Sequence, residues 1–516
     1  MDLQLMLSFN DKKNLKMKNK VIVMLFSAAL AMTGCKDSFF DINQNPNNPT
    51  EPTVKASYLL PMVLKQTASR MGTEYSWAAS WSGYWGRGSD FGPSLPLENY
   101  DITPSYQQTQ WANSSTSWYD VLTDADFMEK KGKATNEEFY VGVSKVMKSI
   151  GFMYLVDMYN NVPYSDALRG DAAVAPKYDK GEDIYKDLLV QLDSARLIFK
   201  KGPAISDEIR NADVLFGGDL TKWRKLANTQ ALKLLIHQSE FNKNPSAEIA
   251  KITADGSGFI EADKSANLTI AFAMAANQVN PVYSTYVANQ NGTLADGFNR
   301  VSNYLLNRYK NTNDIRYQYL FLPARNPVDP NNRWVGKDLG ATNVKGASSS
   351  QESIVIGTGI LKDGTQPLWL MTSVESLFLQ AEAVQRGWIT GDAKTAYENA
   401  VKESFKWLKV TDASTVSTAF LLSPSANWAT AANKLELIIN QKYLSLPGIN
   451  NFEAYVDYRR LGFPKDVPLS KNTSVGTRKI PLRLMYPQNE YSFNNANVKA
   501  QGDIDPQKNK IFWDVD

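Results

Sequence analysis

Cys35 is the only cysteine in the 516 residues of this chain, and its surroundings suggest what its thiol does. It follows an apolar run, residues 21–32, which is itself preceded by three lysines within residues 16–20. A basic segment, a short apolar run and small residues before the cleavage point are typical of an export signal. These 12 apolar residues are too few to cross a bilayer, which needs about 20. We therefore predict a lipoprotein signal peptide in residues 1–34 and a lipid on the Cys35 thiol.

Two further boundaries follow from the N-terminal sequence. Met17 opens the string MKNK directly before the apolar run, so the natural start is either Met1 or Met17. Residues 36–53 are polar and rich in asparagine and proline, a composition that disfavours regular structure. We expect residues 35–53 to be a lipidated tether. Residues 54–516 should form a single domain, because no linker-like or charged stretch divides them.

The charge of the chain argues against nucleic acid as a partner. The 56 basic and 53 acidic side chains include five lysines and two aspartates within residues 1–34, so the mature chain has 51 of each. Binding to phosphate backbones needs clustered lysine and arginine in excess. A balanced mature chain therefore predicts no nucleic-acid binding.

Catalytic constellations are missing from the sequence. With His237 as the only histidine and Cys35 as the only cysteine, histidine-based triads, HExxH zinc sites and cysteine–histidine dyads are excluded. His237 follows Leu234 on an apolar helical stripe, which favours a buried structural histidine. No carboxylate spacing favours a glycosidase pair. We expect no enzymatic activity, no cofactor and no metal site, although the loop aspartates and asparagines leave Ca²⁺ binding open without a DxDxDG pattern.

Helical periodicity dominates the chain beyond the tether. Thr372 and Glu375 form a capping-box pattern for a helix that stops at Gly387, and Asp392 is placed to cap the next helix, through residue 408. The short connection predicts an antiparallel hairpin of the tetratricopeptide type. We predict a mainly α fold with about four such helix pairs, drawing also on the amphipathic segments 136–158 (with Thr135 and Glu138 as a second capping box), 182–199, 221–241 and 433–446.

Aromatic residues are concentrated between residues 75 and 119, which hold five of the twelve tryptophans. Trp77, Trp81 and Trp85 recur at i, i+4 and i+8, which predicts that they align on one face of a helix ending at Gly86 and Gly88. The regions near 72–120 and 255–368 are loop-rich, and loops on a rigid frame often carry binding surfaces.

These aromatics suggest a chemistry of recognition. A sugar ring presents an apolar C–H face and a hydroxyl edge, so it binds an exposed aromatic ring flanked by hydrogen-bonding side chains. The alternative is that tryptophans at helical spacing are core residues. The ligand-binding candidates are Trp77, Trp81, Tyr84, Trp85, Arg87, Asp90, Trp111, Asn113, Tyr283, Tyr286 and Trp334.

Several separated strings together resemble the SusD/RagB family of nutrient-binding outer-membrane lipoproteins. They run in order through the mature chain: CKDSFFDINQNPNNPT from Cys35, YLVDMYNNVPYSDAL at 154–168, DVLFGGDLTKWRKLANTQALKLL at 213–235, WLMTSVESLFLQAEAVQRGWITGDAKTAYENAVKESF at 369–405, NFEAYVDYRRLGFP at 451–464 and IPLRLMYPQNEYSFN at 480–494. The departures, Asn160-Asn161 for Gly-Asp and Ile315 for proline, fall at turn or scaffold positions.

The resemblance implies a SusD-like fold, with four tetratricopeptide-like helix pairs carrying a loop-rich ligand-binding half. It also implies a lipid-anchored protein on the outer membrane of a Gram-negative bacterium, facing the exterior. The partner implied is a TonB-dependent SusC-like transporter, to which the protein would deliver an oligosaccharide or, in some branches, a peptide. We interpret the motif residues as architectural, with buried arginine–aspartate pairs: Tyr164, Trp223, Asp457, Arg459 and Arg460.

Three other functions remain open on the sequence. The first is RagB-like binding of peptides, and the second is a tetratricopeptide scaffold that contacts only envelope proteins. The third and weakest is a lipid-anchored glycoside hydrolase. A capture protein should bind its ligand unchanged, a scaffold should bind no small ligand, and a hydrolase should shorten the glycan.

Overall fold

The computed structural model describes residues 54–112 and 116–515. The predicted signal peptide, Cys35, the tether and Asn113 lie outside the described residues. Residues 55–516 form one compact unit.

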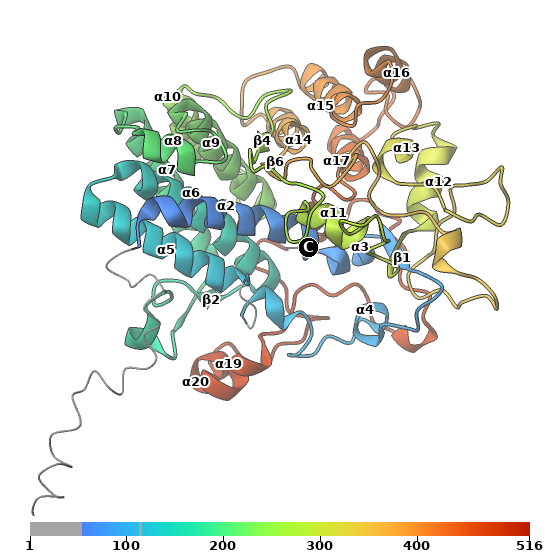
Figure 1. Cartoon of the computed structure of the whole chain (residues 1–516), viewed down its shortest axis with the longest axis horizontal. Coiled ribbons are helices and arrows are strands. Elements are labelled where there is room, and N and C mark those ends of the chain that lie inside the picture. The colour runs from blue at the N-terminus through green and yellow to red at the C-terminus, as the bar shows by residue number, and fades with distance from the viewer. Residues whose placement is uncertain (1–53, 113–115, 516) are drawn as a thin grey trace, which may run out of the picture. The chain divides into compact units, whose positions relative to one another are not determined.

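Helices dominate the regular structure of this unit, and the mainly α architecture is confirmed. In Figure 1 one group of helices, α5, α6, α7 and α9, lies apart from the loop-rich region around α12, α13 and β1. Within the helical scaffold α5 packs on α6, α6 on α7, α7 on α9, and α9 on α14, which also contacts α15 and α17. The bounds are α5 Trp118–Thr135, α6 Glu138–Tyr159, α7 Gly181–Lys201, α9 Leu220–His237, α14 Ser373–Gln385, α15 Ala393–Trp407, α16 Ala413–Phe420 and α17 Lys434–Ser445.

The remaining helices cover the scaffold or sit within the loops. They are α2 Ala56–Thr73, α3 Ser76–Trp81, α4 Leu95–Asn99, α8 Asp207–Ala212, α10 Ser246–Asp255, α11 Pro281–Tyr286, α12 Asn303–Asn311, α13 Tyr317–Leu320, α18 Asn451–Leu461, α19 Gln488–Phe493 and α20 Asn495–Lys499, with 3₁₀ turns η3 Gln108–Gln110, η4 Gly170–Ala173, η5 Ser349–Gln351 and η6 Thr473–Val475. The sequence analysis missed α2 and α5.

Strands are short and pair only in twos within the described residues. All three pairs are antiparallel: β1 Trp85–Arg87 with β5 Asn299–Val301, β2 Val162–Pro163 with β3 Tyr178–Asp179, and β4 Ala266–Asn267 with β6 Trp369–Met371. The first pair, with Trp85 opposite Val301, joins two parts of the loop-rich half.

Helix capping follows local sequence in α14 and α15 but not in α6. The Thr372 hydroxyl accepts a hydrogen bond from the Glu375 amide at 3.2 Å, and the Asp392 carboxylate accepts one from the Thr395 amide at 2.8 Å. The second capping box is wrong, because Thr135 is the last residue of α5 and its hydroxyl bonds the Lys131 carbonyl.

Helix α6 is buried around its whole circumference. It is long and apolar enough to cross a membrane by composition, yet 89% of its most apolar window is enclosed by protein. A helix that is apolar on all sides and covered by neighbouring helices is a core helix. The amphipathic pattern expected for 136–158 is therefore absent.

A network of ionised side chains runs through the scaffold. Glu453 of α18 is completely buried and lies 2.7 Å from the Lys233 amine, 3.2 Å from the His237 ring and 3.2 Å from the Lys442 amine. These cations belong to α9 and α17, so one carboxylate holds three helices together. Burial opposes the charge of Glu453, but Lys233, His237 and Lys442 outweigh it and hold its pKa well below the usual range.

The predicted arginine–aspartate pairing of the motif residues is confirmed at Arg460. Its guanidinium lies 2.7 Å from Asp457 and 2.7 Å from Glu382 of α14, and all three side chains are buried. His237 is buried as expected, with a ring nitrogen 2.9 Å from Asp157.

Candidate functional site

The three tryptophans named as candidates for a binding platform are enclosed in the structure, as the alternative of core residues predicts. Trp77, Trp81 and Trp85 have at most 1% of their surface exposed. They do not share a helix either, since α3 ends at Trp81 and Trp85 lies in strand β1. The predicted continuous helix through Gly86 is therefore wrong.

The partners of these rings explain their burial. Trp77 and Trp81 lie 4.8 Å apart between ring centres, and the Tyr455 ring of α18 lies 5.4 and 5.7 Å from them. The Trp81 indole donates to the Leu97 carbonyl at 3.1 Å. Edge-to-face rings at such distances form a packed aromatic core. The expectation that these rings stack on a ligand fails in this conformation, because α18 covers them.

Three other aromatic candidates are also buried. The Trp111 ring packs edge-on against Tyr159 at 5.1 Å, and the Tyr286 hydroxyl donates to the Thr73 carbonyl. Tyr84 donates to the Tyr443 carbonyl, which joins the aromatic segment to α17. Their rings are not available for stacking on a ligand in this conformation.

A pocket of about 400 Å³ opens in the loop-rich half. Its lining comes from three segments that are distant in sequence, residues 87–98, 338–343 and 471–473. We call it the loop-half pocket. Of the candidates from sequence, Arg87 lines it.

A stacked aromatic pair, one half-buried ring and one exposed ring, stands at the edge of this pocket. Phe91 lines the pocket, and Phe298 stacks on it with ring centres 3.9 Å apart and planes 25° from parallel. The Arg87 guanidinium lies 5.2 Å from the Phe298 ring centre. Phe298 is 49% exposed, so one aromatic surface remains open to solvent beside polar groups. This combination is what a sugar ring requires.

The polar lining is balanced in charge. The Lys471 amine lies 2.7 Å from Asp338, and the Arg87 guanidinium lies 3.6 Å from Glu98. The Asn343 amide donates to the Phe91 carbonyl at 3.1 Å. Two cations face two carboxylates, so the pocket favours an uncharged, hydrogen-bonding ligand over an ion.

Asp90, another candidate, does not line the pocket and instead binds the turn at η5. Its carboxylate accepts hydrogen bonds from the Ser349 amide at 2.9 Å and from the Ser349 hydroxyl, and the hydroxyl bond lowers the pKa of Asp90. The buried guanidinium of Arg300 donates to the Ser349 carbonyl at 2.9 Å. Asp90 and Arg300 thereby fix the turn at η5 against strands β1 and β5.

Close backbone approach explains two glycines here. A β-carbon at Gly86 would lie 1.9 Å from the Lys337 carbonyl oxygen, so only glycine lets residues 335–338 cross strand β1. A β-carbon at Gly297 would lie 2.8 Å from the Phe91 ring. The absence of a side chain at Gly297 therefore allows the Phe91 ring to pack against Phe298.

Two further candidates lie elsewhere. Trp334 is half-buried and packs edge-on against Tyr317 at 5.1 Å, with its carbonyl accepting from the Lys310 amine at 2.8 Å. Tyr283 is half-buried in α11, close to Gly364. Neither is among the residues that line the loop-half pocket.

Sequence reasoning missed Phe91 and Phe298 as site residues. Phe91 stands in irregular sequence before Gly92 and Pro93, and Phe298 follows Gly297. An aromatic beside glycine or proline, outside any helical spacing, is the signal that could have found them. The residues missed on the polar side are Glu98, Asp338, Asn343, Lys471 and Asn472.

A protein-family model described as "Starch-binding associating with outer membrane" matches residues 46–487. The chain belongs to this SusD-like family. SusD-like proteins bind nutrients in association with the outer membrane and are binding proteins, and the resemblance seen in the sequence is confirmed. Comparison with curated protein sequences gave no match.

Solved structures of SusD homologues share the fold. A SusD homologue from Bacteroides uniformis ATCC 8492 has a TM-score of 0.73 and 22% identity, covering 89% of this chain and 100% of its own. A SusD/RagB family protein from Bacteroides thetaiotaomicron VPI-5482 has a TM-score of 0.72 and 23% identity, with 89% and 99% coverage. A chitin-binding protein has a TM-score of 0.68 and 23% identity, also with 89% and 99% coverage.

Proposed function

We propose that this SusD-like protein captures a neutral oligosaccharide at the loop-half pocket. The observation that carries the proposal is the Phe91–Phe298 pair, an open aromatic surface held beside Arg87 and a charge-balanced polar lining. The stacked rings receive the apolar face of a sugar, and the amide and charged groups of the lining receive its hydroxyls.

The location and partner form part of the same proposal. A lipid on Cys35 anchors the protein to the outer membrane, where it faces the cell exterior. The captured glycan passes to a TonB-dependent SusC-like transporter without being cleaved. Family membership and the export-signal pattern before Cys35 support this arrangement.

Calorimetric titration of the mature chain lacking Cys35 tests the proposal. A panel of starch-type and chitin-type oligosaccharides is appropriate, given the family description and the chitin-binding structural relative. Phe298→Ala should weaken binding by about tenfold, since an aromatic contact contributes up to about 1.4 kcal/mol. Phe493→Ala, which removes a 78% exposed ring elsewhere, is the matched control and should leave affinity unchanged.

Two results would count against the proposal. If peptides bind and no oligosaccharide does, the ligand class is wrong. If glycans shorten on prolonged incubation, the protein is a hydrolase. We further propose that no metal takes part, so that addition of EDTA should leave the affinity unchanged.

A further inference from the structure

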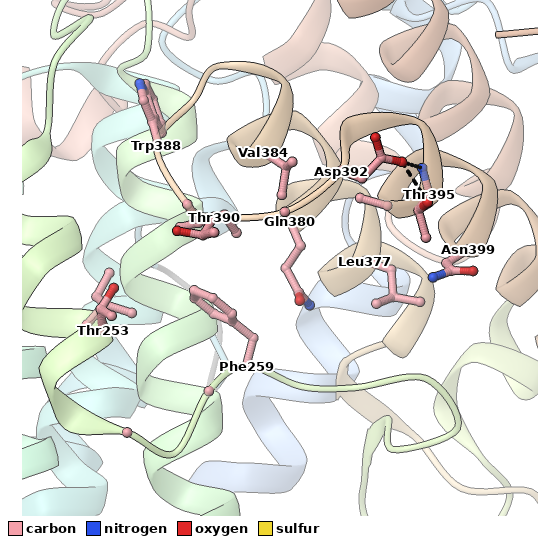
Figure 2. A pocket seen from close by; sticks show the side chains of 16 residues that line it. Thr253, Phe259, Leu377, Gln380, Val384, Trp388, Thr390, Asp392, Thr395 and Asn399 are labelled. Carbon is pink, nitrogen blue, oxygen red and sulfur yellow. Dashed lines mark hydrogen bonds between the residues drawn. The ribbon is translucent and has the colours of Figure 1, made fainter.

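A cavity of about 690 Å³ lies in the helical scaffold and shares no lining residue with the loop-half pocket. It is formed by the end of α10 and the loop after it, the outer face of α14, the α14–α15 connection and the start of α15 (Figure 2). We call it the scaffold pocket. Its size is typical of cavities that hold small ligands.

The scaffold pocket contains Phe259, and hydrogen bonds to the backbone hold the residues on both sides of it in place. The carbonyl of Gly258 accepts from the Asn228 amide at 2.9 Å, and the amide of Ile260 donates to the Thr229 hydroxyl at 3.0 Å. Asn228, Thr229 and Ile260 are buried. The Phe259 ring between these anchors is only half-buried and extends into the cavity (Figure 2).

Gln380 of α14 provides a hydrogen-bond acceptor in the same space. Its Nε2 donates to the Ile260 carbonyl at 3.0 Å and to the Ser376 hydroxyl at 3.0 Å. A carbonyl can only accept, so the nitrogen must lie on that side and Oε1 must lie on the other. Figure 2 shows the Gln380 side chain reaching from α14 toward the side of the cavity that holds Phe259.

The lining carries almost no charge. Asp392 is the only ionisable residue among those that line the cavity, and its carboxylate is occupied by the Thr395 amide at 2.8 Å and the Thr395 hydroxyl at 2.6 Å. Leu377 and Val384 add apolar surface, and the exposed Asn399 amide adds a donor and an acceptor at the rim. A cavity with one carboxylate, which is already hydrogen-bonded, and otherwise only aromatic, apolar and amide groups suits neither an anion nor a charged peptide.

We infer that the scaffold pocket is a second carbohydrate site, which binds a neutral sugar unit against Phe259 with its hydroxyls on Gln380 and Asn399. The inference rests on the proposed function for the class of ligand, but it concerns a different surface of the protein. Two separate sites would let one protein hold two chains, or two parts of a long chain, at once.

Hydrogen–deuterium exchange of the mature chain tests this site directly, with maltoheptaose and chitohexaose as the two probes. A saturating concentration of at least one probe should slow exchange in residues 256–263 and in residues 377–399. The protection should persist in Phe298→Ala, which damages only the loop-half pocket. In Phe259→Ala the ligand concentration that gives half of the full protection should rise about tenfold.

A milder variant and a control complete the test. Asn399→Ala removes only an exposed amide and should raise the ligand concentration for half of the full protection about threefold. This variant keeps the test valid even if Phe259→Ala fails to fold. Phe493→Ala should have no effect. Protection confined to residues 87–98 and 338–343 would overturn the second site and leave the proposed function intact. Protection at neither place with either probe would overturn both.

Discussion

Around helix α18 arginine and aromatic side chains are enclosed, whereas at the loop-half pocket an arginine and a phenylalanine stay partly open to solvent. Arg460 and its two carboxylate partners are buried, and Trp81 is covered on all sides by other rings. Arg87 retains 19% side-chain exposure, and Phe298 is half exposed. The comparison teaches that surroundings, and not residue type, decide which of these side chains is free to bind a ligand.

The largest expected effect comes from removing a buried ring. Trp81→Ala should lower the free energy of unfolding by about 3–5 kcal/mol, because it leaves a cavity between Trp77 and Tyr455. Phe298→Ala should cost less than about 1 kcal/mol, since its ring is half exposed. Urea denaturation measures both, and equal losses would erase the distinction between the two regions.

Substitution of a buried charged residue should lower the free energy of unfolding almost as much. Arg460→Met keeps the apolar bulk but leaves Glu382 and Asp457 without their shared cation, at a cost of about 3 kcal/mol. Arg87→Met breaks a partly exposed pair and should cost less than about 1 kcal/mol. A stable Arg460→Met variant, with an unchanged denaturation midpoint, would show that the network contributes nothing to the scaffold.

A smaller effect should appear on raising the pH. Burial disfavours a charged His237, but the carboxylates of Glu453 and Asp157 outweigh it and raise the pKa of His237 above its ordinary 6.5. Its stabilising contribution is therefore complete below about pH 6.5 and is lost as the pH rises through the folded-state value.

The variant His237→Gln isolates this contribution, because the chain has no other histidine. The free energy of unfolding of the wild type should fall with increasing pH above 6.5 relative to that of the variant. Parallel pH profiles for the two proteins would mean that folding does not raise the pKa of His237.

The smallest effect concerns salt and the loop-half pocket. In each of its two ion pairs, Lys471–Asp338 and Arg87–Glu98, the positive charge is neutralised by a neighbouring carboxylate. Raising the ionic strength tenfold should therefore change the affinity for a neutral oligosaccharide less than about twofold. A steep loss of affinity with salt, measured by calorimetry, would instead indicate a charged ligand.

Local signals in the sequence predicted a large part of the scaffold. Thr372 and Asp392 cap their helices as expected, because an N-cap depends only on residues a few positions away. The family strings predicted the fold class, and the burial of Arg460 and His237 also followed from the sequence.

The candidate site was harder to predict because it depends on contacts between distant segments. Trp77 and Trp81 are buried by Tyr455, far along the chain, and no local spacing reveals that contact. Phe91 meets Phe298 only because strands β1 and β5 pair. Helical spacing of the tryptophans left both a platform and a core open, and only these distant contacts show the core.

A crystal structure of the mature chain with a bound oligosaccharide tests the central claim most directly. We predict a sugar ring lying against Phe298, with Arg87 and Asn343 within hydrogen-bonding distance and with Trp77, Trp81 and Trp85 still enclosed. A ligand stacked on any of those three tryptophans, or a loop-half pocket empty at saturation, would contradict the account.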